Sequence, residues 1–248
     1  MLKTKISAVS YTNSYPFVYG LQHHIISKHI ELSLDNPAVC AKKLVNNEVD
    51  IGLIPVIALE ELNYYNILSG YCIGAVNNVQ TVVLASNNEL QEIKEVFLDN
   101  QSRSSNMLCR VLEKNYWRKG LEFQYNNEIT LPVLKENQGC IIIGDRVFET
   151  RSNYKYRYDL SKEWFEFTRL PFVFAVWAAN KQLNPQFIEQ FEQAVYFGMQ
   201  NMDKAIEVLA EPDKKDILKD YYTRNISYIF DNEKKKGMKL FLEYAKKL

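Results

Sequence analysis

Short apolar runs alternate with amphipathic stretches along most of this chain, and this pattern predicts alternating strands and helices. Residues 5–10 alternate as a strand does, and Pro16 suits the first turn of a helix, where its missing N–H costs nothing. Asn36-Pro37 repeats that signal with a capping residue before proline. Residues 49–55 predict the next strand, which ends in a proline turn. Two such units favour an open α/β lobe on a parallel, mostly covered sheet.

The middle of the chain repeats this logic after an interruption. An apolar run at residues 82–85 is broken by Ser86-Asn87-Asn88, where we expect a hinge. Residues 95–99 predict a strand, and the polar turn at residues 100–105 opens a helix with apolar positions at helical spacing. Residues 140–143 are too continuously apolar for a solvated strand, so we expect a buried parallel strand that Gly144-Asp145 closes.

A long apolar segment and helical stripes end the chain. Residues 170–178 are long enough to carry the chain back across the hinge, and the last seventy residues repeat apolar positions every three or four residues. We therefore expect two lobes joined near Leu84 and Val176, with the C-terminal residues returning to the first lobe. The predicted lobes are residues 1–84 with 176–248, and residues 85–175, with a ligand cleft between them.

Polar side chains gather where three of the predicted strands end, the place where open parallel sheets bind ligands. Two of these turns precede helices, whose free N–H groups attract carboxylates or phosphates. The alternative is that a residue of each turn only caps its helix. Three serines and an arginine in one turn exceed what a cap needs. The candidate binding residues are Thr12, Asn13 and Ser14 in the first turn, Ser102, Arg103, Ser104 and Ser105 in the second, and Gly144 and Asp145 in the third.

Composition narrows the class of partner. Thirty Lys and Arg residues balance thirty Asp and Glu residues, so no overall charge draws the chain to nucleic acid or to an anionic membrane. No stretch is long and apolar enough to span a bilayer, and the first residues lack the pattern of a signal peptide, which leads us to expect a cytoplasmic protein. The four cysteines sit among apolar neighbours and the three histidines lack the spacing of a zinc site, so we expect buried thiols and no metal.

Six segments carry a family resemblance: Ser10 to Phe17, Asp50 to Pro55, Leu98-Asp99 with Ser102 to Ser105, Ile143 to Asp145, Tyr158 to Leu160 with Trp164, and Leu170 to Trp177. In this order they resemble the motifs of the chorismate dehydratases, which act in the futalosine route to menaquinone. The resemblance implies a two-lobed α/β fold like that of type II periplasmic binding proteins, with mixed sheets flanked by helices. It implies a hydro-lyase that converts chorismate, a small dicarboxylate, to 3-[(1-carboxyvinyl)oxy]benzoate without a cofactor.

The resemblance also assigns residues. The characteristic asparagine of the family corresponds to Asn13, and the serine-rich anion turn to residues 102–105. Thr81 replaces an expected serine and keeps its hydroxyl, so we retain it as a substrate-binding candidate, whereas Arg169 stands where glycine is common. A neutral amide is a weak base. We therefore expect Asn13 to orient the substrate, while Asp145 or a carboxylate of the substrate removes the proton.

Other classes share this fold. A non-enzymatic anion-binding protein is the main alternative, although an exported one would carry a signal peptide. The effector domain of a transcription regulator would follow a DNA-binding region. A dihydroxynaphthoate synthase of the same pathway resembles the chain in fold but carries a histidine in its second lobe, and all three histidines here precede residue 30.

Overall fold

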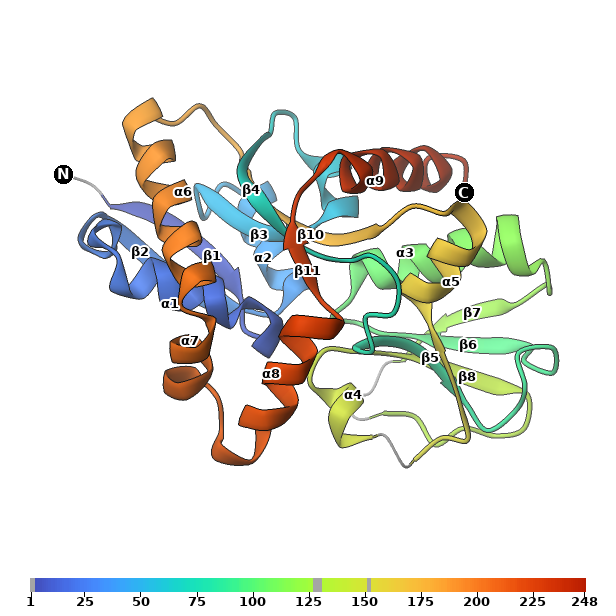
Figure 1. The fold of residues 1–248 in the computed structure, drawn as a ribbon. Coiled ribbons are helices and arrows are strands. Elements are labelled where there is room, and N and C mark those ends of the chain that lie inside the picture. The colour runs from blue at the N-terminus through green and yellow to red at the C-terminus, as the bar shows by residue number, and fades with distance from the viewer. Residues whose placement is uncertain (1–2, 127–130, 151–152) are drawn as a thin grey trace. The chain divides into compact units, whose positions relative to one another are not determined.

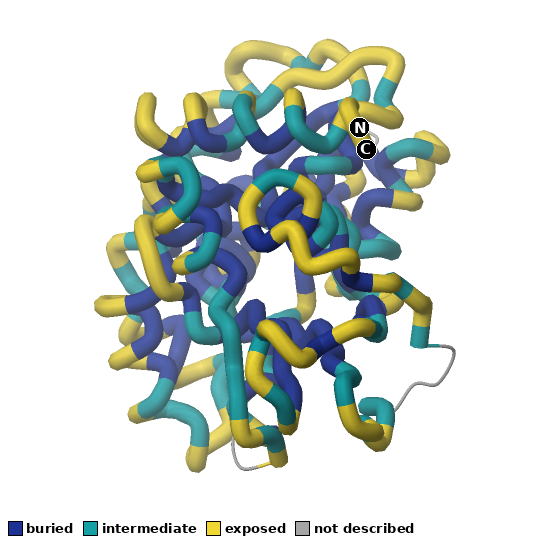
Figure 2. The backbone as a smooth tube through the Cα atoms, turned by 90° about the vertical axis from the view of Figure 1, so that its right-hand side faces the viewer, coloured by how far each residue is buried: buried dark blue, intermediate teal, exposed yellow. Residues whose placement is uncertain are grey.

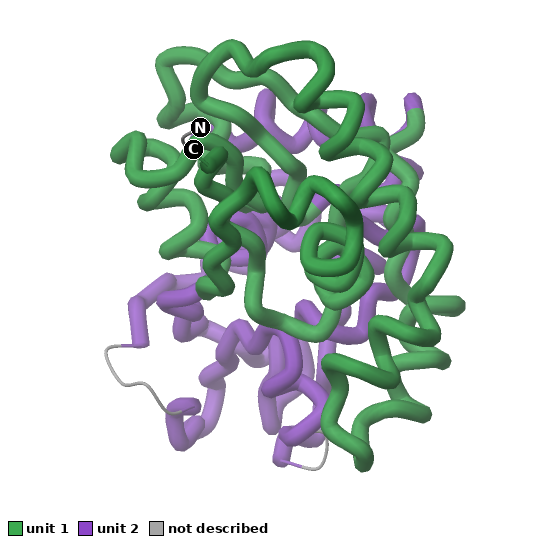
Figure 3. Tube along the Cα trace, turned by 90° about the vertical axis from the view of Figure 1, so that its left-hand side faces the viewer, with its two compact units in different colours: residues 1–73, 174–231 green, residues 74–173, 232–248 purple. Residues whose placement is uncertain are grey.

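The computed structural model describes residues 3–126, 131–150 and 153–248. The chain forms two compact units, residues 1–73 with 174–231 (unit 1) and residues 74–173 with 232–248 (unit 2), which Figure 3 colours separately. Each unit has its own mixed sheet with helices packed around it. The predicted fold class is therefore confirmed.

The six-stranded sheet of unit 1 has the order β11-β4-β10-β3-β1-β2. Strand β1 runs parallel to β2 and β3, whereas β10 runs antiparallel to β3. All five residues of β3 and all eight of β10 are buried, which explains their continuous apolar sequences. The strands are β1 (Thr4–Val9), β2 (Ile30–Asp35), β3 (Ile51–Pro55), β4 (Asn66–Ala75), β10 (Phe172–Ala179) and β11 (Ser227–Ile229).

Proline at the first or second position starts several helices of unit 1. Asn36 and Asn184 cap two of them by accepting the N–H of Val39 and Gln186, and the sequence predicts the first of these caps. The helices, drawn in Figure 1, are the 3-10 turn η1 (Thr12–Ser14), α1 (Tyr15–His23), η2 (Ile25–His29), α2 (Pro37–Val45), η3 (Val56–Glu61), α6 (Pro185–Gln200), α7 (Met202–Leu209), η5 (Pro212–Lys214) and α8 (Lys215–Arg224).

Helices α1 and α6 pack closely because glycines meet between them. A Cβ atom built on Gly198 would lie 1.9 Å from the carbonyl oxygen of Pro16, and one built on Gly20 would lie 2.1 Å from that of Ala194. Neither position has room for a larger residue. This contact holds α1 close to α6 at the helix end that leaves the Thr12–Ser14 turn.

The five-stranded sheet of unit 2 has the order β7-β6-β8-β5-β9. Strand β6 runs parallel to β7 and β8, whereas β5 runs antiparallel to β8 and β9. The strands are β5 (Val82–Ser86), β6 (Glu95–Leu98), β7 (Glu122–Tyr125), β8 (Gln138–Ile143) and β9 (Tyr156–Asp159), and the helices are α3 (Arg103–Leu112) with a π-helical turn η4 (Glu113–Trp117), α4 (Arg146–Glu149), α5 (Leu160–Thr168) and α9 (Asn232–Ala245).

Aromatic side chains fill the core between the helices of unit 2. Trp164 of α5 is fully buried and meets Phe172 and Phe241 edge to face, with ring centroids 5.6 Å and 6.2 Å apart. Helix α5 ends at Arg169, which adopts a left-handed backbone with φ +61°. A glycine suits such a position, and the structure shows that arginine occupies it here. Figure 2 colours the backbone by burial, with buried residues dark blue and exposed residues yellow.

Several sequence predictions need correction. The predicted hinge near Leu84 is wrong, because residues 82–86 form the internal strand β5, and the chain leaves unit 1 within β4 instead. The C-terminal residues belong to unit 2, since α9 packs against α3. The units thus differ from the predicted lobes, 1–84 with 176–248 and 85–175. Strand β8 is buried as expected but parallel only to β6.

Two further observations concern the whole described chain. All four cysteines are free and buried, as predicted. Across residues 3–126, 131–150 and 153–248, no helix combines the length and apolar character required to cross a bilayer, and no group of His, Cys, Asp or Glu side chains is arranged to hold a metal ion.

Candidate functional site

The first predicted turn follows β1 in unit 1 and forms the 3-10 turn η1. The hydroxyl of Ser14 donates to the carbonyl oxygens of Val9 and Tyr11, so it is used inside the turn. Ser14 occupies the N-cap position of α1 but makes no side-chain cap hydrogen bond. The alternative that Ser14 only caps the helix therefore finds no support.

Two tyrosines that come late in the sequence of unit 1 hold this turn. The hydroxyl of Tyr222 on α8 donates to the carbonyl oxygen of Thr12, and that of Tyr228 on β11 donates to the carbonyl oxygen of Asn13 at 2.9 Å. With its backbone fixed, Asn13 presents a buried side-chain oxygen, Oδ1, that has no hydrogen-bond partner in the part of the chain that the structure describes. Leaving such an acceptor unsatisfied costs about 1–3 kcal/mol, a cost that a hydrogen-bonding substrate would remove.

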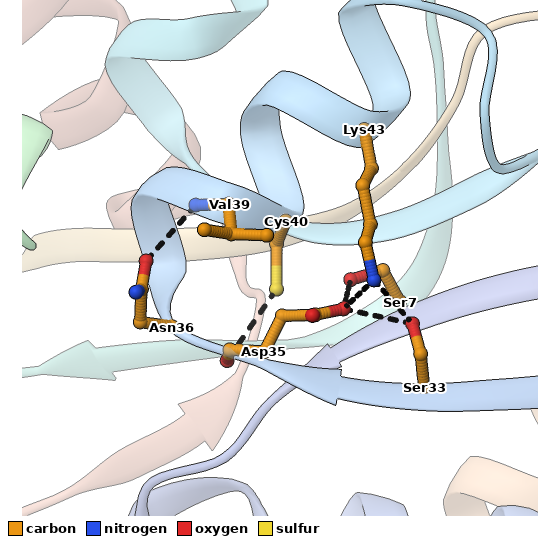
Figure 4. Close-up of polar contacts among 7 residues, drawn as sticks. All are labelled: Ser7, Ser33, Asp35, Asn36, Val39, Cys40 and Lys43. Atoms are coloured by element: carbon orange, nitrogen blue, oxygen red, sulfur yellow. Dashed lines mark hydrogen bonds and ion pairs between the residues drawn. The ribbon is translucent and has the colours of Figure 1, made fainter.

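A hydrogen-bonded cluster supports the same edge of the sheet (Figure 4). The carboxylate of Asp35, at the end of β2, accepts hydrogen bonds from the hydroxyls of Ser7 and Ser33 at 2.8 Å and from Lys43 Nζ at 2.6 Å. Burial alone would raise the pKa of Asp35, but these three hydrogen bonds hold it below its ordinary value. The carbonyl oxygen of Asp35 accepts the N–H of Ser10 at 2.9 Å, so the cluster also fixes where the turn leaves β1.

The remaining predicted residues gather at one edge of the sheet of unit 2. Strands β6 and β8 are parallel neighbours, so residues 99–105 and 144–145 follow the same edge. Strand β5 runs the opposite way and begins there, with Val82 opposite Ile143. Thr81 is consequently close to Gly144, whose N–H donates to the Thr81 carbonyl oxygen at 2.9 Å. Gly144 has φ +63°, a conformation that favours glycine, and its N–H is used within the protein rather than held out for a ligand.

The serine-rich turn opens α3. Ser102 is its N-cap residue but makes no side-chain cap hydrogen bond, and the side chains of Ser104 and Ser105 are buried in the first turn. Arg103 is half-buried, and this burial lowers the pKa of its guanidinium, which nevertheless stays charged at neutral pH. The turn therefore joins hydroxyls, a helix N-terminus and a cation, a combination suited to a carboxylate.

An ion pair that the sequence reading missed joins the turns after β6 and β8. Arg146 Nη2 contacts Asp99 Oδ2, and Asp99 Oδ1 accepts the N–H of Gln101 at 2.8 Å. Burial raises the pKa of Asp99 above its ordinary value, although the charge of Arg146 acts the other way. The pair borders a cavity of about 120 Å³ whose wall also includes Phe97, Asn100, Gln101 and Cys140. Asp145 occupies the N-cap of α4 without a side-chain cap bond and is half-buried.

Sequence signals for the missed residues differ. Asp99 belongs to a segment that carries the family resemblance, and Arg146 directly follows Gly144-Asp145, so both lie close in sequence to a candidate residue. Tyr222 and Tyr228 have no such signal, because they lie more than two hundred residues from the turn that they hold.

Relatives of known class cover nearly the whole chain. A chorismate dehydratase of Thermus thermophilus is 26% identical over 259 residues, covering 92% of this chain and 94% of its own. A chorismate dehydratase of Campylobacter jejuni is 25% identical over 246 residues, covering 96% and 92%.

Solved structures show the same fold. A crystal structure of a protein from Archaeoglobus fulgidus matches with a TM-score of 0.77 at 17% identity, covering 99% of this chain and 97% of that one. A Candida albicans protein described as having the generic periplasmic binding protein fold matches with a TM-score of 0.69 at 16% identity, covering 100% and 91%. A family model described as menaquinone biosynthesis matches residues 4–247, and the chain belongs to that family.

Proposed function

We propose that this protein is a chorismate dehydratase, a carbon-oxygen lyase that converts chorismate to 3-[(1-carboxyvinyl)oxy]benzoate and water in menaquinone biosynthesis. The family and the names of its relatives support this assignment. The structural observation that carries it is Asn13, whose buried amide oxygen has no partner among the described residues and sits on a turn fixed by two tyrosines. The protein would work in the cytoplasm, where a biosynthetic enzyme meets its substrate.

The reaction asks little of the protein in terms of chemistry. Chorismate loses one ring hydrogen and its hydroxyl group, which leave together as water, and no other substituent is lost. The ring becomes aromatic, and this gain in stability drives the reaction. Orientation of the substrate can then supply most of the rate, on the order of 7 kcal/mol at best. No external oxidant or reductant enters this balance.

Each edge has its own part in the proposal. Asn13 donates or accepts hydrogen bonds that orient the substrate, since a neutral amide is too weak a base to remove the proton. Ser102, Arg103, Ser104 and Ser105 hold a carboxylate, and Thr81 contributes its hydroxyl. The proton leaves to Asp145 or to a carboxylate of the substrate itself. Ser14 and Gly144 shape the turns, because the Ser14 hydroxyl and the Gly144 N–H are already used within the protein, and Thr12 stays a substrate-binding candidate.

The test is direct. Purified protein incubated with chorismate is expected to produce an aromatic ultraviolet spectrum together with the product's proton resonances. Asn13→Ala is expected to lower turnover at least a hundredfold, the loss typical of a misplaced substrate. If chorismate binds but no aromatic product forms, the protein is instead an anion-binding protein of the same fold.

A second variant, compared with Asn13→Ala, identifies the catalytic base. Asp145→Asn removes the carboxylate with little change of shape. A fall in turnover by about a hundred to ten thousandfold would identify Asp145 as the base, in the range that general base catalysis supplies. Near-normal turnover in Asp145→Asn, together with loss in Asn13→Ala, would leave the substrate carboxylate as the base.

A further inference from the structure

The carboxylate of Asp159 joins two segments at the candidate edge of unit 2. Its Oδ1 atom accepts the N–H groups of Ser161 at 3.0 Å and Lys162 at 3.1 Å, which caps α5. Its Oδ2 atom accepts the N–H of Gln80 at 2.6 Å, across 79 residues of sequence. The β9–β5 register, with Asp159 opposite Val83, brings these segments together.

Gln80 needs this support because its backbone is left-handed. Its φ of +64° is unfavourable for a residue with a side chain, and such conformations persist only where surrounding contacts enforce them. Asn78 Oδ1 also accepts the Gln80 N–H, at 3.0 Å. The next residue is Thr81, which is buried and whose carbonyl oxygen accepts the Gly144 N–H. Asp159 thus fixes the residue before Thr81, and the Gly144 N–H fixes the carbonyl oxygen of Thr81 itself.

Capping alone does not explain a carboxylate at this place. An asparagine or serine caps a helix about as well as aspartate, without the cost of burying a charge. Aspartate differs in having a second acceptor oxygen, and that oxygen is the one that binds Gln80.

We propose that Asp159 is a positioning residue that holds Gln80 in its left-handed conformation and thereby sets the place of the Thr81 hydroxyl for substrate binding. The geometry stands on the structure alone, whereas the consequence for catalysis rests on the proposed function. The residue touches no substrate in this scheme and acts only through Gln80 and Thr81.

The variant Asp159→Ser separates the two duties of the carboxylate. Serine can still cap α5, but its side chain is too short to reach Gln80. Amide hydrogen exchange of the full-length protein, without substrate, is expected to quicken at Gln80 and Thr81 while that of Ser161 and Lys162 changes little. With chorismate, kcat/KM is expected to fall about tenfold to a hundredfold, the loss expected for a contact displaced by about 1 Å.

Two further variants serve as a fallback and as a control. Asp159→Asn is the second choice if the serine variant does not fold, because its amide can satisfy only one of the two sets of N–H groups. Glu163→Gln is the matched control: it neutralises a carboxylate within α5 that accepts the Trp117 Nε1–H at 2.8 Å. Its kcat/KM is expected to stay within about twofold of the parent protein, since a neutral amide oxygen still accepts that bond.

The outcomes separate this proposal from the proposed function. Unchanged amide hydrogen exchange at Gln80 in both Asp159 variants would overturn the proposal that Asp159 holds Gln80. Quickened exchange with unchanged kcat/KM in an active protein would show that Thr81 needs no positioning, which also overturns the proposal. A parent protein that does not dehydrate chorismate would remove the proposed function, and exchange together with chorismate affinity would then decide the role of Asp159.

Discussion

The hydroxyl of Tyr228 donates a 2.9 Å hydrogen bond to the carbonyl oxygen of Asn13, and this bond links residues 215 positions apart in sequence. Tyr228 is buried against Phe17, with ring centroids 5.3 Å apart, so the phenol has little freedom to turn away. Burial raises the pKa of Tyr228 well above its ordinary value, and the phenol therefore remains protonated and able to donate.

Tyr228→Phe tests whether this bond positions Asn13. The ring packing is kept and only the hydroxyl is lost, so the free energy of unfolding is expected to fall by about 1 kcal/mol. A shifted Asn13 is expected to lower kcat by tenfold or more, because misplaced contacts weaken orientation. Enzyme assays and urea unfolding of the same samples measure both effects.

Tyr158→Phe provides the comparison. It removes a phenol oxygen that accepts the N–H of Leu90 at 2.7 Å, a tyrosine–backbone bond elsewhere in the chain in which the phenol accepts instead of donating. We expect a similar loss of stability and a much smaller loss of kcat. Equal losses of kcat in both variants would contradict a specific role of Tyr228.

Asp35→Asn tests the cluster that supports the same turn. The amide cannot accept three hydrogen bonds on one atom beside a lysine, so we expect a loss of about 1–3 kcal/mol at pH 7. The folded-state pKa of Asp35 lies below its ordinary 3.8, so its contribution is present above that value and disappears as the pH falls through the lower folded-state pKa.

Urea unfolding of the Asp35 variant and the parent protein between pH 3 and 7 checks this sign. The stability difference between the two proteins should shrink toward acid pH. A difference that is constant over the whole range would contradict the ionised cluster.

Asp159 predicts the opposite dependence on pH. Burial raises its pKa from the ordinary 3.8 to about 6, against the N–H groups of Lys162, Gln80, Val79 and Ser161. Its contribution to stability is therefore full below about pH 4 and is lost as the pH rises through 6. The loss is at most about 3 kcal/mol, and less where water reaches the carboxyl.

The stability of Asp159→Ser relative to the parent protein measures this contribution. We expect the parent protein to lose stability relative to the variant as the pH rises from about 4 to 7. A relative gain over that interval would mean that the hydrogen bonds outweigh burial and that the pKa is lowered.

Gly198→Ala tests the close contact of α1 with α6. The added methyl group would lie 1.9 Å from the Pro16 carbonyl oxygen, which is backbone and cannot turn aside. We expect destabilisation by more than about 3 kcal/mol, in the upper range for single substitutions. Thermal unfolding of Gly70→Ala is the control, because its nearest neighbour is the flexible end of Glu192 at 3.2 Å.

Local signals explain what the sequence could predict. The cap and proline at Asn36-Pro37 mark a helix start, and the continuous apolar segment at residues 140–143 marks a buried strand; both are found in the structure. The hinge near Leu84 was wrong because an apolar run followed by polar residues describes an internal strand equally well.

Long-range partners explain what it could not. The polar turns at residues 12–14 and 102–105 are visible in the sequence, but the bonds from Tyr222 and Tyr228 depend on the folded topology. The hydrogen bond from the Gly144 N–H to the Thr81 carbonyl oxygen is a second example. It follows from the antiparallel pairing of β5 with β8, which the periodicity of apolar residues in the sequence does not reveal.

Unit 1 is assembled from two segments that are far apart in sequence, residues 1–73 and 174–231, and this orders events during translation. Tyr228 is synthesised 215 residues after Asn13, roughly 10–40 s later at ordinary ribosome speeds. Strand β10 lies between β4 and β3 in the sheet but is synthesised long after both. For most of that interval β4 and β3 therefore lack the strand that joins them. A nascent chain released before residue 228 therefore carries the candidate catalytic amide without the phenol that holds it, and such fragments should be inactive.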